Sequence, residues 1–383
     1  MNKPKVYLIQ NNIAPYRIKL FSTISKNADF DFSVVLTAKK CKHRPNWDFD
    51  TKKMPFKVQT MKGINVALSY EKSFSFSFGL IRKLVSDRPD IVICGGFNSA
   101  TLITYFYKRL LGGKYIVWSE STDITERRIC KAKVMLRRLL ARNADAFIDA
   151  GTLSRRYLES LIPEGLSRPF FRALNCVDGL VFSSDSEDYR EHDLDMSNIS
   201  SQNILFVGRL NENKGIPMLL EVYREVVKEC QNEPGLFLVG EGPLKTHVQK
   251  YKCERGLSKI YIEGQVPYGR VVRYYRTCDV FVLLSLSDCN PLVVLEALHC
   301  GIPIICTDRA GNAPDFIVPG ENGYIVDPTD KERIVQCIIE VLSWDSEKRD
   351  CAARLSKELV KKANYADSAE AFVRACHHVH TTK

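Results

Sequence analysis

The strongest constraint on the fold is the alternation, along the chain, of short β-branched runs with longer helix-compatible segments. In the first half, strands are expected at residues 6–10, 32–36, 91–94, 116–118 and 146–148, and helices at 16–25, 99–111 and 131–142. Strands that alternate with helices in this way predict an α/β fold, in which a parallel sheet is covered by helices on both faces.

The second half of the chain repeats this alternation. Its expected strands lie at 204–207, 236–239, 260–262, 280–284, 304–306 and 323–326, with helices at 216–229 and 291–300. We therefore expect two Rossmann-like, doubly wound parallel-sheet domains that face each other across a cleft. The carboxyl ends of both sheets would border that cleft, because open α/β sheets bind their ligands there.

The chain length of 383 residues also fits two domains, at roughly 100–200 residues each. An acidic, polar stretch at 185–195 is typical of a surface insertion or linker and marks the boundary. We expect an N-terminal domain at 1–180, a C-terminal domain at 181–365, and a final helix at 366–383 that packs back on the N-terminal domain.

The cysteine and histidine patterns argue against a metal site or a disulfide framework. The 13 cysteines are scattered singly without a CxxC pair, and several, such as Cys94, Cys300 and Cys306, stand in apolar runs. This pattern predicts buried thiols in a reducing compartment. The seven histidines are dispersed, so we expect no metal and no cofactor.

No stretch reaches about 18 uncharged apolar residues, so no transmembrane helix is expected. The first apolar run, at 6–10, is too short for a signal peptide and no cleavage site follows it. Both features favour a cytoplasmic protein.

A phosphate site is expected after the first strand of the C-terminal half. The strand at 204–207 leads into Gly208 and Arg209, and Lys214 precedes the next helix. Glycine lets a backbone approach a ligand closely, and two cations near a helix N-terminus suit an anion. A surface loop with ordinary charges is the structural alternative.

Two further glycine turns follow the next strands. Gly240, Gly242 and Pro243 form a tight turn after 236–239, and Val266 lies in a loop that could frame a nucleobase. Either turn alone indicates no more than a change of chain direction.

The most informative stretch runs from Asp288 to Glu296. Asn290 is a good helix N-cap and Pro291 suits the first helical position, so the helix dipole would point at the ligand edge of the sheet. Glu296 then stands inside an apolar run, where a carboxylate is costly without hydroxyl or cationic partners. Sugar hydroxyls would serve, and so would a structural arginine.

Together these motifs resemble the retaining GT-B glycosyltransferases of family 4, the glycosyl transferases group 1. The resemblance extends to the first half, where 11–17 is similar to the first loop of that family's acceptor domain and 118–122 and 175–178 also match. The motifs that carry it in the second half are Gly208-Arg209, Lys214-Gly215, Gly240-Glu241-Gly242-Pro243, Gly264-Gln265-Val266, Asp288 with Glu296, and Gly320-Glu321-Asn322-Gly323.

The resemblance implies a role for each matching residue. The donor diphosphate would contact Arg209, Lys214, Gly208 and the backbone near Leu292 and Val293. The nucleoside would contact Glu296, Val266 and Gly240, and the catalytic group would comprise Asp288, Glu296 and Glu120, with Glu120 as an acceptor-side base beside Tyr16 and Arg17.

The implied reaction is a metal-independent transfer of a sugar from a UDP or GDP donor, with retention of anomeric configuration. The acceptor would be a glycan or a polyprenyl-linked molecule in cell-surface polysaccharide synthesis. Cations and a helix N-terminus would stabilise the leaving diphosphate. A sugar-nucleotide epimerase on the same scaffold is the alternative enzyme, and a binding module with a decayed site is a third hypothesis.

The sequence departs from the family pattern around the donor sugar. Asp288 replaces the usual Glu, Cys289-Asn290-Pro291 replaces Gly-Phe-Gly, and Asp315 stands where a later Glu is usual. Pro291 has no N–H to donate. These changes bear on the identity of the sugar.

The formal net charge of +10 implies an anionic partner. Segment 126–142 is basic and helix-compatible, and a second basic cluster comprises Lys39, Lys40, Lys42, His43, Arg44, Trp47, Lys52 and Lys53. One hypothesis is that the first domain sits on an anionic membrane, at the inner face of the cell membrane. A solvated basic helix is the alternative, and nucleic acid is not expected as a partner because no recognised motif for it occurs.

Overall fold

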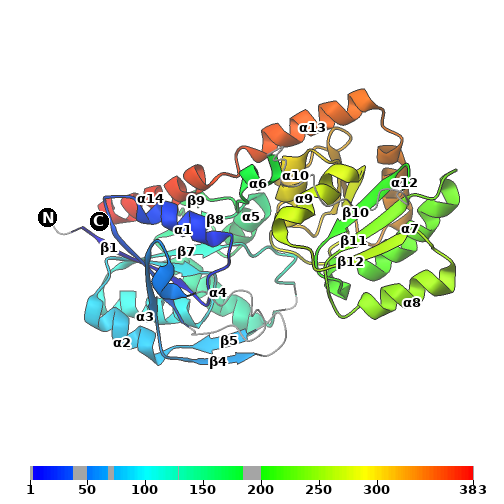
Figure 1. Cartoon of the computed structure of the whole chain (residues 1–383). Helices are drawn as coiled ribbons and strands as arrows, with labels where there is room; N and C mark the ends of the chain where they lie inside the picture. The colour runs from blue at the N-terminus through cyan, green and yellow to red at the C-terminus, as the bar shows by residue number, and fades with distance from the viewer. Residues whose placement is uncertain (1–2, 38–49, 68–72, 128, 184–199, 383) are drawn as a thin grey trace. The chain divides into compact units, whose positions relative to one another are not determined.

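The computed structural model describes residues 3–37, 50–67, 73–127, 129–183 and 200–382, which fall into two compact units (Figure 1). Unit 1 comprises Met1–Cys176 and Ala363–Lys383, and unit 2 comprises Val177–Lys362. The boundary between them follows residue 176, four residues before the one expected from the sequence. The acidic stretch 185–195 lies outside the described residues.

Unit 1 is built on a seven-stranded parallel sheet in the order β3-β2-β1-β6-β7-β8-β9. Its strands are β1 (Lys5–Gln10), β2 (Asp31–Leu36), β3 (Lys57–Thr60), β6 (Ile91–Gly95), β7 (Lys114–Ser119), β8 (Ala146–Asp149) and β9 (Phe170–Arg172). The central strands are buried along almost their whole length because helices cover both faces. A separate antiparallel hairpin, β4 (Ile64–Ala67) and β5 (Ser73–Phe76), precedes the helix at 78–87, and a short 3-10 turn, η2 (Thr51–Lys53), precedes β3.

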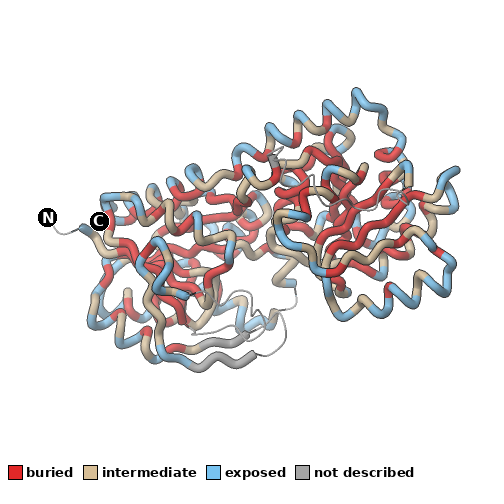
Figure 2. The backbone as a smooth tube through the Cα atoms, in the orientation of Figure 1, coloured by how far each residue is buried: buried red, intermediate tan, exposed pale blue. Residues whose placement is uncertain are grey.

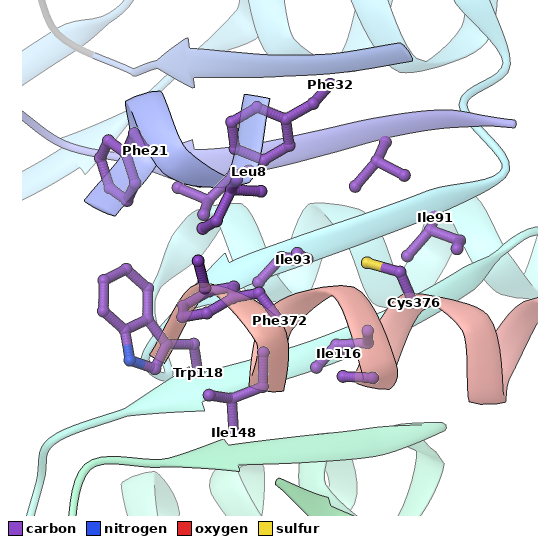
Figure 3. Close-up of a cluster of buried hydrophobic side chains, with 14 of the residues drawn as sticks. Leu8, Phe21, Phe32, Ile91, Ile93, Ile116, Trp118, Ile148, Phe372 and Cys376 are labelled. Carbon is purple, nitrogen blue, oxygen red and sulfur yellow. The ribbon is translucent and has the colours of Figure 1, made fainter. Parts of the chain in front are cut away.

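One face of this sheet is covered by α1 (Arg17–Ser25) and by α14 (Tyr365–Thr381), the last helix of the chain. Figure 3 shows the core between this face of the sheet and the two helices. The Trp118 ring packs edge-on against the rings of Phe372 and Phe21, with ring centroids 5.0 Å and 6.2 Å apart. The Ser368 hydroxyl donates to the Leu174 carbonyl at 2.8 Å, which fixes α14 against the end of the sheet. The final helix of the chain therefore completes the N-terminal core.

The other face is covered by α2 (Phe78–Asp87), α3 (Ser99–Leu111), α4 (Lys131–Asn143) and α5 (Thr152–Ser160). Their buried residues pack on Tyr115, Phe147 and neighbouring aliphatic side chains of the strands. Figure 2 shows the buried strands in the interior and the exposed outer sides of the helices.

Unit 2 contains a six-stranded parallel sheet in the order β12-β11-β10-β13-β14-β15. Its strands are β10 (Asn203–Val207), β11 (Gly235–Val239), β12 (Ile260–Gly264), β13 (Val280–Leu283), β14 (Ile304–Thr307) and β15 (Gly323–Val326). Its helices are α6 (Gly179–Ser183), α7 (Ile216–Glu229), α8 (Lys245–Arg255), α9 (Tyr268–Thr277), α10 (Leu292–Cys300), α11 (Ala313–Phe316), α12 (Lys331–Leu342) and α13 (Ser346–Val360), and η5 (Glu212–Lys214) is a 3-10 turn.

The structure also bears on disulfide bonds, metal sites and membrane-spanning helices. The cysteines within the described ranges are all free, with Cys94 and Cys306 buried and Cys300 partly so. The same part of the chain holds no cluster of His, Cys, Asp or Glu arranged to bind a metal ion. Among the helices described, none is long and apolar enough to cross a bilayer.

Candidate active site

The site lies at the point in unit 2 where the strand order reverses. On one side of β10 the sheet continues with β11 and then β12. On the other side it continues with β13, β14 and β15. The loops that follow β10 and β13 therefore diverge to opposite sides of the sheet, and this topological switch point is the usual ligand site of an open α/β sheet.

Closely packed glycines form the floor of the site. The Gly208 N–H donates to the Val239 carbonyl at 2.9 Å, and the Gly240 N–H donates to the Gly264 carbonyl at 2.8 Å. A Cβ atom on Gly240, whose φ is +141°, would stand 1.9 Å from the Gly208 carbonyl oxygen. The turns after β10, β11 and β12 thus lie side by side, in contact that side chains would prevent.

The loop between β10 and α7 is fixed against the end of β13. The Asn211 side chain accepts a hydrogen bond from the Lys214 N–H at 2.9 Å, which forms η5. Gly215 ends that turn with φ at +72°, and a Cβ atom there would lie 2.0 Å from the Leu284 carbonyl oxygen. Only glycine permits this approach, which carries Lys214 toward the loop after β13.

Lys214 forms an ion pair with Asp288, and both side chains are mostly buried. Two hydrogen bonds hold the same loops together: the Asn213 amide donates to the Ser287 carbonyl, and the Leu286 N–H donates to the Asn213 carbonyl, each at 2.8 Å. A cation at this position is therefore neutralised by Asp288, and an incoming anion would share or displace that carboxylate.

Arg209 lies in the same loop, directly after Gly208, and is half-buried. Its carbonyl oxygen accepts from the Asn211 N–H at 2.9 Å, so its backbone belongs to the turn that positions Lys214. The two cations expected to contact an anion thus lie in one short loop at the switch point.

The prediction that Asn290 is the N-cap of the next helix is wrong. Helix α10 begins at Leu292, Pro291 occupies the cap position, and no side chain caps the helix. Asn290 instead accepts a hydrogen bond at 3.2 Å from the buried amide of Asn312, which also donates to the Pro291 carbonyl at 2.9 Å. The first backbone N–H groups of a helix have no partner within it, and at α10 these belong to Leu292 and Val293.

Glu296 is only 7% exposed and lies on the inner face of α10. Its Oε2 accepts a hydrogen bond from the Tyr275 hydroxyl of α9 at 2.9 Å. Burial raises the pKa of the Glu296 carboxyl group to about 7, although the Tyr275 hydrogen bond favours the ionised form. The partner is a tyrosine, and no arginine among the described residues forms an ion pair with Glu296, so the structural alternative of a Glu–Arg pair does not apply there.

A pocket of about 570 Å³ opens beside Glu296. Its walls include Val207 at the end of β10, Val266 after β12, Tyr268 at the start of α9 and Val293 in the first turn of α10. One carboxyl group in a mainly apolar wall is the arrangement expected for a ligand with a flat apolar part and nearby hydroxyl groups.

Unit 1 brings three of the predicted residues together at the carboxyl edge of its own sheet. Arg17 forms an ion pair with Glu120 after β7, and its guanidinium lies 4.4 Å from the Trp118 ring and 5.5 Å from the ring of Tyr16. It also donates to the Gln10 side-chain oxygen at 3.1 Å.

Several residues of the two sites were given no role from the sequence. Gln10 and Trp118 belong to the unit 1 cluster, and the buried amide nitrogen of Gln10 has no hydrogen-bond partner among the described residues. Tyr275, Tyr268 and Asn312 belong to unit 2. Gln10 gave a signal that could have been used, because it is the one polar residue that ends an otherwise apolar strand.

Comparison with known proteins supports this arrangement. Residues 197–358 match the family model described as "Glycosyl transferases group 1". An uncharacterized glycosyltransferase of Methanocaldococcus jannaschii is 25% identical over 42% of this chain and 44% of its own length. The putative teichuronic acid biosynthesis glycosyltransferase TuaC of Bacillus subtilis is 30% identical over 46% of this chain and 41% of its own length. The matched segments thus span less than half of these relatives.

Solved structures resemble the chain over nearly its whole length. Sucrose-phosphate synthase from Thermosynechococcus elongatus aligns with a TM-score of 0.75 at 16% identity, covering 98% of this chain and 99% of that one. Anabaena HepE in complex with UDP and glucose aligns with a TM-score of 0.74 at 13% identity, covering 98% and 100%. The chain therefore has the GT-B fold, and its residues 197–358 match the model of the glycosyl transferases group 1 family.

Proposed function

We propose that this protein transfers a sugar from a nucleotide-diphosphate sugar to a glycan or lipid-linked acceptor in the synthesis of a cell-surface polysaccharide. The observation that carries the proposal is the convergence, at one switch point, of the Lys214–Asp288 pair, the start of α10 and the buried carboxyl group of Glu296. A family match over 197–358 covers the same residues.

The nucleoside is proposed to occupy the pocket beside Glu296. Its volume of about 570 Å³ suits a nucleoside, and Val266, Val293 and Tyr268 offer apolar surface to the base. Glu296 would accept hydrogen bonds from the ribose hydroxyls, and these would supply the polar partners that a buried carboxylate needs. Gly240 lets the turn after β11 pack directly on Gly208, and its backbone is proposed to contact the nucleoside.

The diphosphate is proposed to lie between the two loops. Arg209 and Lys214 would neutralise it, the glycine backbone at Gly208 would allow close approach, and the N–H groups of Leu292 and Val293 would donate to its oxygens. These groups stabilise the negative charge that develops on the leaving diphosphate as its bond to the sugar breaks, so the proposed reaction needs no metal ion.

Asp288 is proposed to exchange partners when the donor binds. In the structure it pairs with Lys214, and its backbone is held by hydrogen bonds with Arg309 and Gly311 at 3.1 and 2.9 Å. As Lys214 turns to phosphate, the carboxylate becomes available to a hydroxyl of the donor sugar. We propose that the transfer retains the anomeric configuration.

The acceptor is proposed to bind at the cluster in unit 1. Arg17 orients Glu120 at the carboxyl edge of the sheet, next to Tyr16, so a hydroxyl acceptor would meet both a donor and an acceptor of hydrogen bonds. Glu120 is proposed as the acceptor-side base. Related proteins include the Escherichia coli O-antigen chain mannosyltransferase B, 29% identical over 39% of this chain, which supports a glycan acceptor.

The donor site is tested by a thermal-shift panel of UDP, GDP and their sugars. A ligand that binds only the folded state raises its stability by about 2.7 kcal/mol at a concentration of 100 Kd. One nucleotide class should raise Tm, and Arg209→Ala or Lys214→Ala should abolish the rise. Lys250→Ala, at an exposed cation on α8, is the matched control and should keep it. An undiminished rise in both site variants would overturn the assigned phosphate site.

The reaction is tested by incubating the stabilising nucleotide sugar with glycan and polyprenyl-linked acceptors. Nuclear magnetic resonance of the product would give the anomeric configuration, and retention is expected. Release of an epimerised nucleotide sugar without an acceptor would favour the epimerase instead. Undiminished turnover after EDTA treatment is expected, and loss of turnover restored by a divalent cation would contradict metal independence.

A further inference from the structure

The outer surface of unit 1 exposes large apolar side chains on three neighbouring helices. Of the twelve such side chains found among the described residues, nine lie on α2, α3 and α4. Phe78 is 63% exposed, Leu110 79% and Met135 70%. A soluble surface carries single exposed apolar side chains, whereas a concentration of this kind indicates a binding surface.

The three helices form one continuous face. They cover the same side of the sheet, and α3 lies between α2 and α4, which both contact it (Figure 1). On α2, Phe78, Ile81 and Val85 fall on one stripe, and on α3, Phe106 and Leu110 are one turn apart. The opposite sides of these helices already supply the core. Among the described residues, Phe78 also packs edge-on against Phe76 of β5, with ring centroids 4.9 Å apart, but most of its surface stays exposed.

The charges on this face are basic. Helices α3 and α4 contain no acidic residue, and the single acid of α2, Asp87, is bound by Lys83 and Tyr7. The exposed cations are Arg82, Arg109, Lys131, Lys133, Arg138 and Arg142. Apolar side chains mixed with cations on one face suit a surface that is apolar within and anionic outside.

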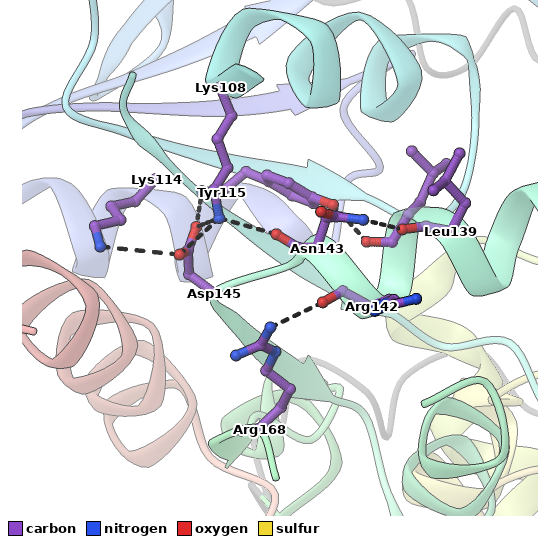
Figure 4. A network of polar contacts seen from close by, with 9 residues as sticks. Lys108, Lys114, Tyr115, Leu139, Arg142, Asn143, Asp145 and Arg168 are labelled. Carbon is purple, nitrogen blue, oxygen red and sulfur yellow. Dashed lines mark hydrogen bonds and ion pairs between the residues drawn. The ribbon is translucent and has the colours of Figure 1, made fainter. Parts of the chain in front are cut away.

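A polar network holds α3 and α4 in fixed relation at their C-terminal ends (Figure 4). The Lys108 ammonium group bonds the Asp145 carboxylate at 2.8 Å and the Asn143 carbonyl at 2.9 Å. Asp145 also accepts from the Tyr115 N–H at 2.8 Å. These contacts tie both helices to the sheet, so the face is a preformed surface.

We propose that the α2–α3–α4 face docks on a bilayer that contains anionic lipid. Two copies of the chain joined through this face would oppose like charges, and a nucleic acid would leave the apolar stripe in water. An anionic bilayer satisfies both features, because its interior accepts the apolar side chains and its headgroups attract the cations. The inference goes beyond the proposed sugar transfer and stands without it.

The sequence predicted membrane contact through 126–142, and the structure changes which residues of that segment can take part. Arg137 is buried, bonded to Glu126 at 2.9 Å and to the Tyr157 hydroxyl, and Leu140 is in the core. Most of the second predicted cluster, from Lys39 to Trp47, lies outside the described residues, and Lys52 and Lys53 belong to η2. The face on α2 and α3 was not predicted.

The test is co-sedimentation of the full chain, without substrates, with phosphatidylglycerol or phosphatidylcholine vesicles at low and high salt. Binding is expected to phosphatidylglycerol at low salt and to weaken as salt screens the charges. Each basic residue near an anionic surface raises the partition coefficient about fivefold, so Arg138→Gln with Arg142→Gln should lower it about 25-fold. Lys250→Gln with Arg255→Gln on α8 makes the same change in net charge and should have little effect.

The apolar contribution is tested separately by Leu110→Ser, which should lower partitioning about tenfold. Leu180→Ser, at a leucine of unit 2 that is 73% exposed, is its control and should bind as the unmodified chain does. Absence of binding to phosphatidylglycerol vesicles at low salt would overturn the proposal. Equal losses for the α4 and α8 pairs would do so too, because attraction would then follow net charge alone. Neither result would bear on nucleotide binding, which the thermal-shift panel measures independently.

Discussion

Replacing Glu296 with Gln should make the stability of the protein less dependent on pH. The buried carboxyl group has a pKa of about 7, against an ordinary value of 4.5. Between these two values the folded state keeps a proton that the unfolded chain has lost, so the unmodified protein loses stability as pH rises. A difference of roughly 2.5 units corresponds to about 3 kcal/mol once both states are ionised. Gln carries no charge and removes this loss.

The assay is urea unfolding of both proteins at pH 5 and pH 8, with circular dichroism as the signal for unfolding. The free energy of unfolding of Glu296→Gln, relative to the unmodified chain, should increase by about 2 to 3 kcal/mol between the two pH values. Glu254→Gln, at an exposed carboxylate of α8, is the control. Its free energy of unfolding, relative to the unmodified chain, should be the same at both pH values. A Glu296→Gln difference that is the same at both pH values would refute the assignment of a desolvated carboxyl group at this position.

Other substitutions test the backbone, the core and the ion pair. Gly215→Ala should cost more than about 1 kcal/mol, because alanine resists φ of +72° and its Cβ would meet the Leu284 carbonyl; a Tm equal to that of the unmodified chain would contradict this packing. Phe372→Ala should destabilise unit 1 by about 3–5 kcal/mol, as measured by urea unfolding, and a loss below about 1 kcal/mol would show that α14 is not part of the core. Asp288→Asn should strengthen binding of the free nucleoside diphosphate, because Lys214 loses its competing anion, while slowing sugar transfer; calorimetry that shows weaker binding would contradict the exchange of partners.

Regular, strongly apolar elements could be predicted from the sequence. The helix expected at 216–229 is α7 (Ile216–Glu229), and the strands expected at 91–94 and 323–326 correspond to β6 and β15 within one residue. In these segments the local pattern and the tertiary burial agree, because each lies in the interior of a parallel sheet or against it.

Elements at the margin of a sheet could not be predicted. The edge strand β3 has the sequence Lys-Val-Gln-Thr, and its pairing with β2 comes from the sheet and not from any periodicity of its own. The helices α2, α5, α8, α9, α12 and α13 were also missed, as were the hairpin of β4 and β5 and the short edge strand β9. Such segments take their conformation from neighbours that are distant in the chain.

In the candidate site, too, single residues could be predicted from the sequence but their contacts could not. Sequence reasoning selected Lys214 and Asp288 one by one, but their ion pair joins residues 74 positions apart, and only the fold brings them together. Asn290 was assigned to the helix cap from its residue type, whereas the buried amide of Asn312 competes for its side chain. Tyr275 could not be paired with Glu296 because the contact depends on how α9 packs against α10.

The membership of α14 in the first core has a consequence for biosynthesis. Residues 1–176 emerge from the ribosome long before 363–383, and until then the Trp118 side of their sheet lacks the Phe372 ring and the helix that covers it. Domains usually fold in the order of synthesis. Here the first half cannot complete its core until residues 363–383 have been synthesised, and an apolar face of its sheet stays exposed until then. Nascent chains should therefore need chaperone protection. A stop codon just before residue 363 would leave unit 2 whole and would disable the half of the protein made first.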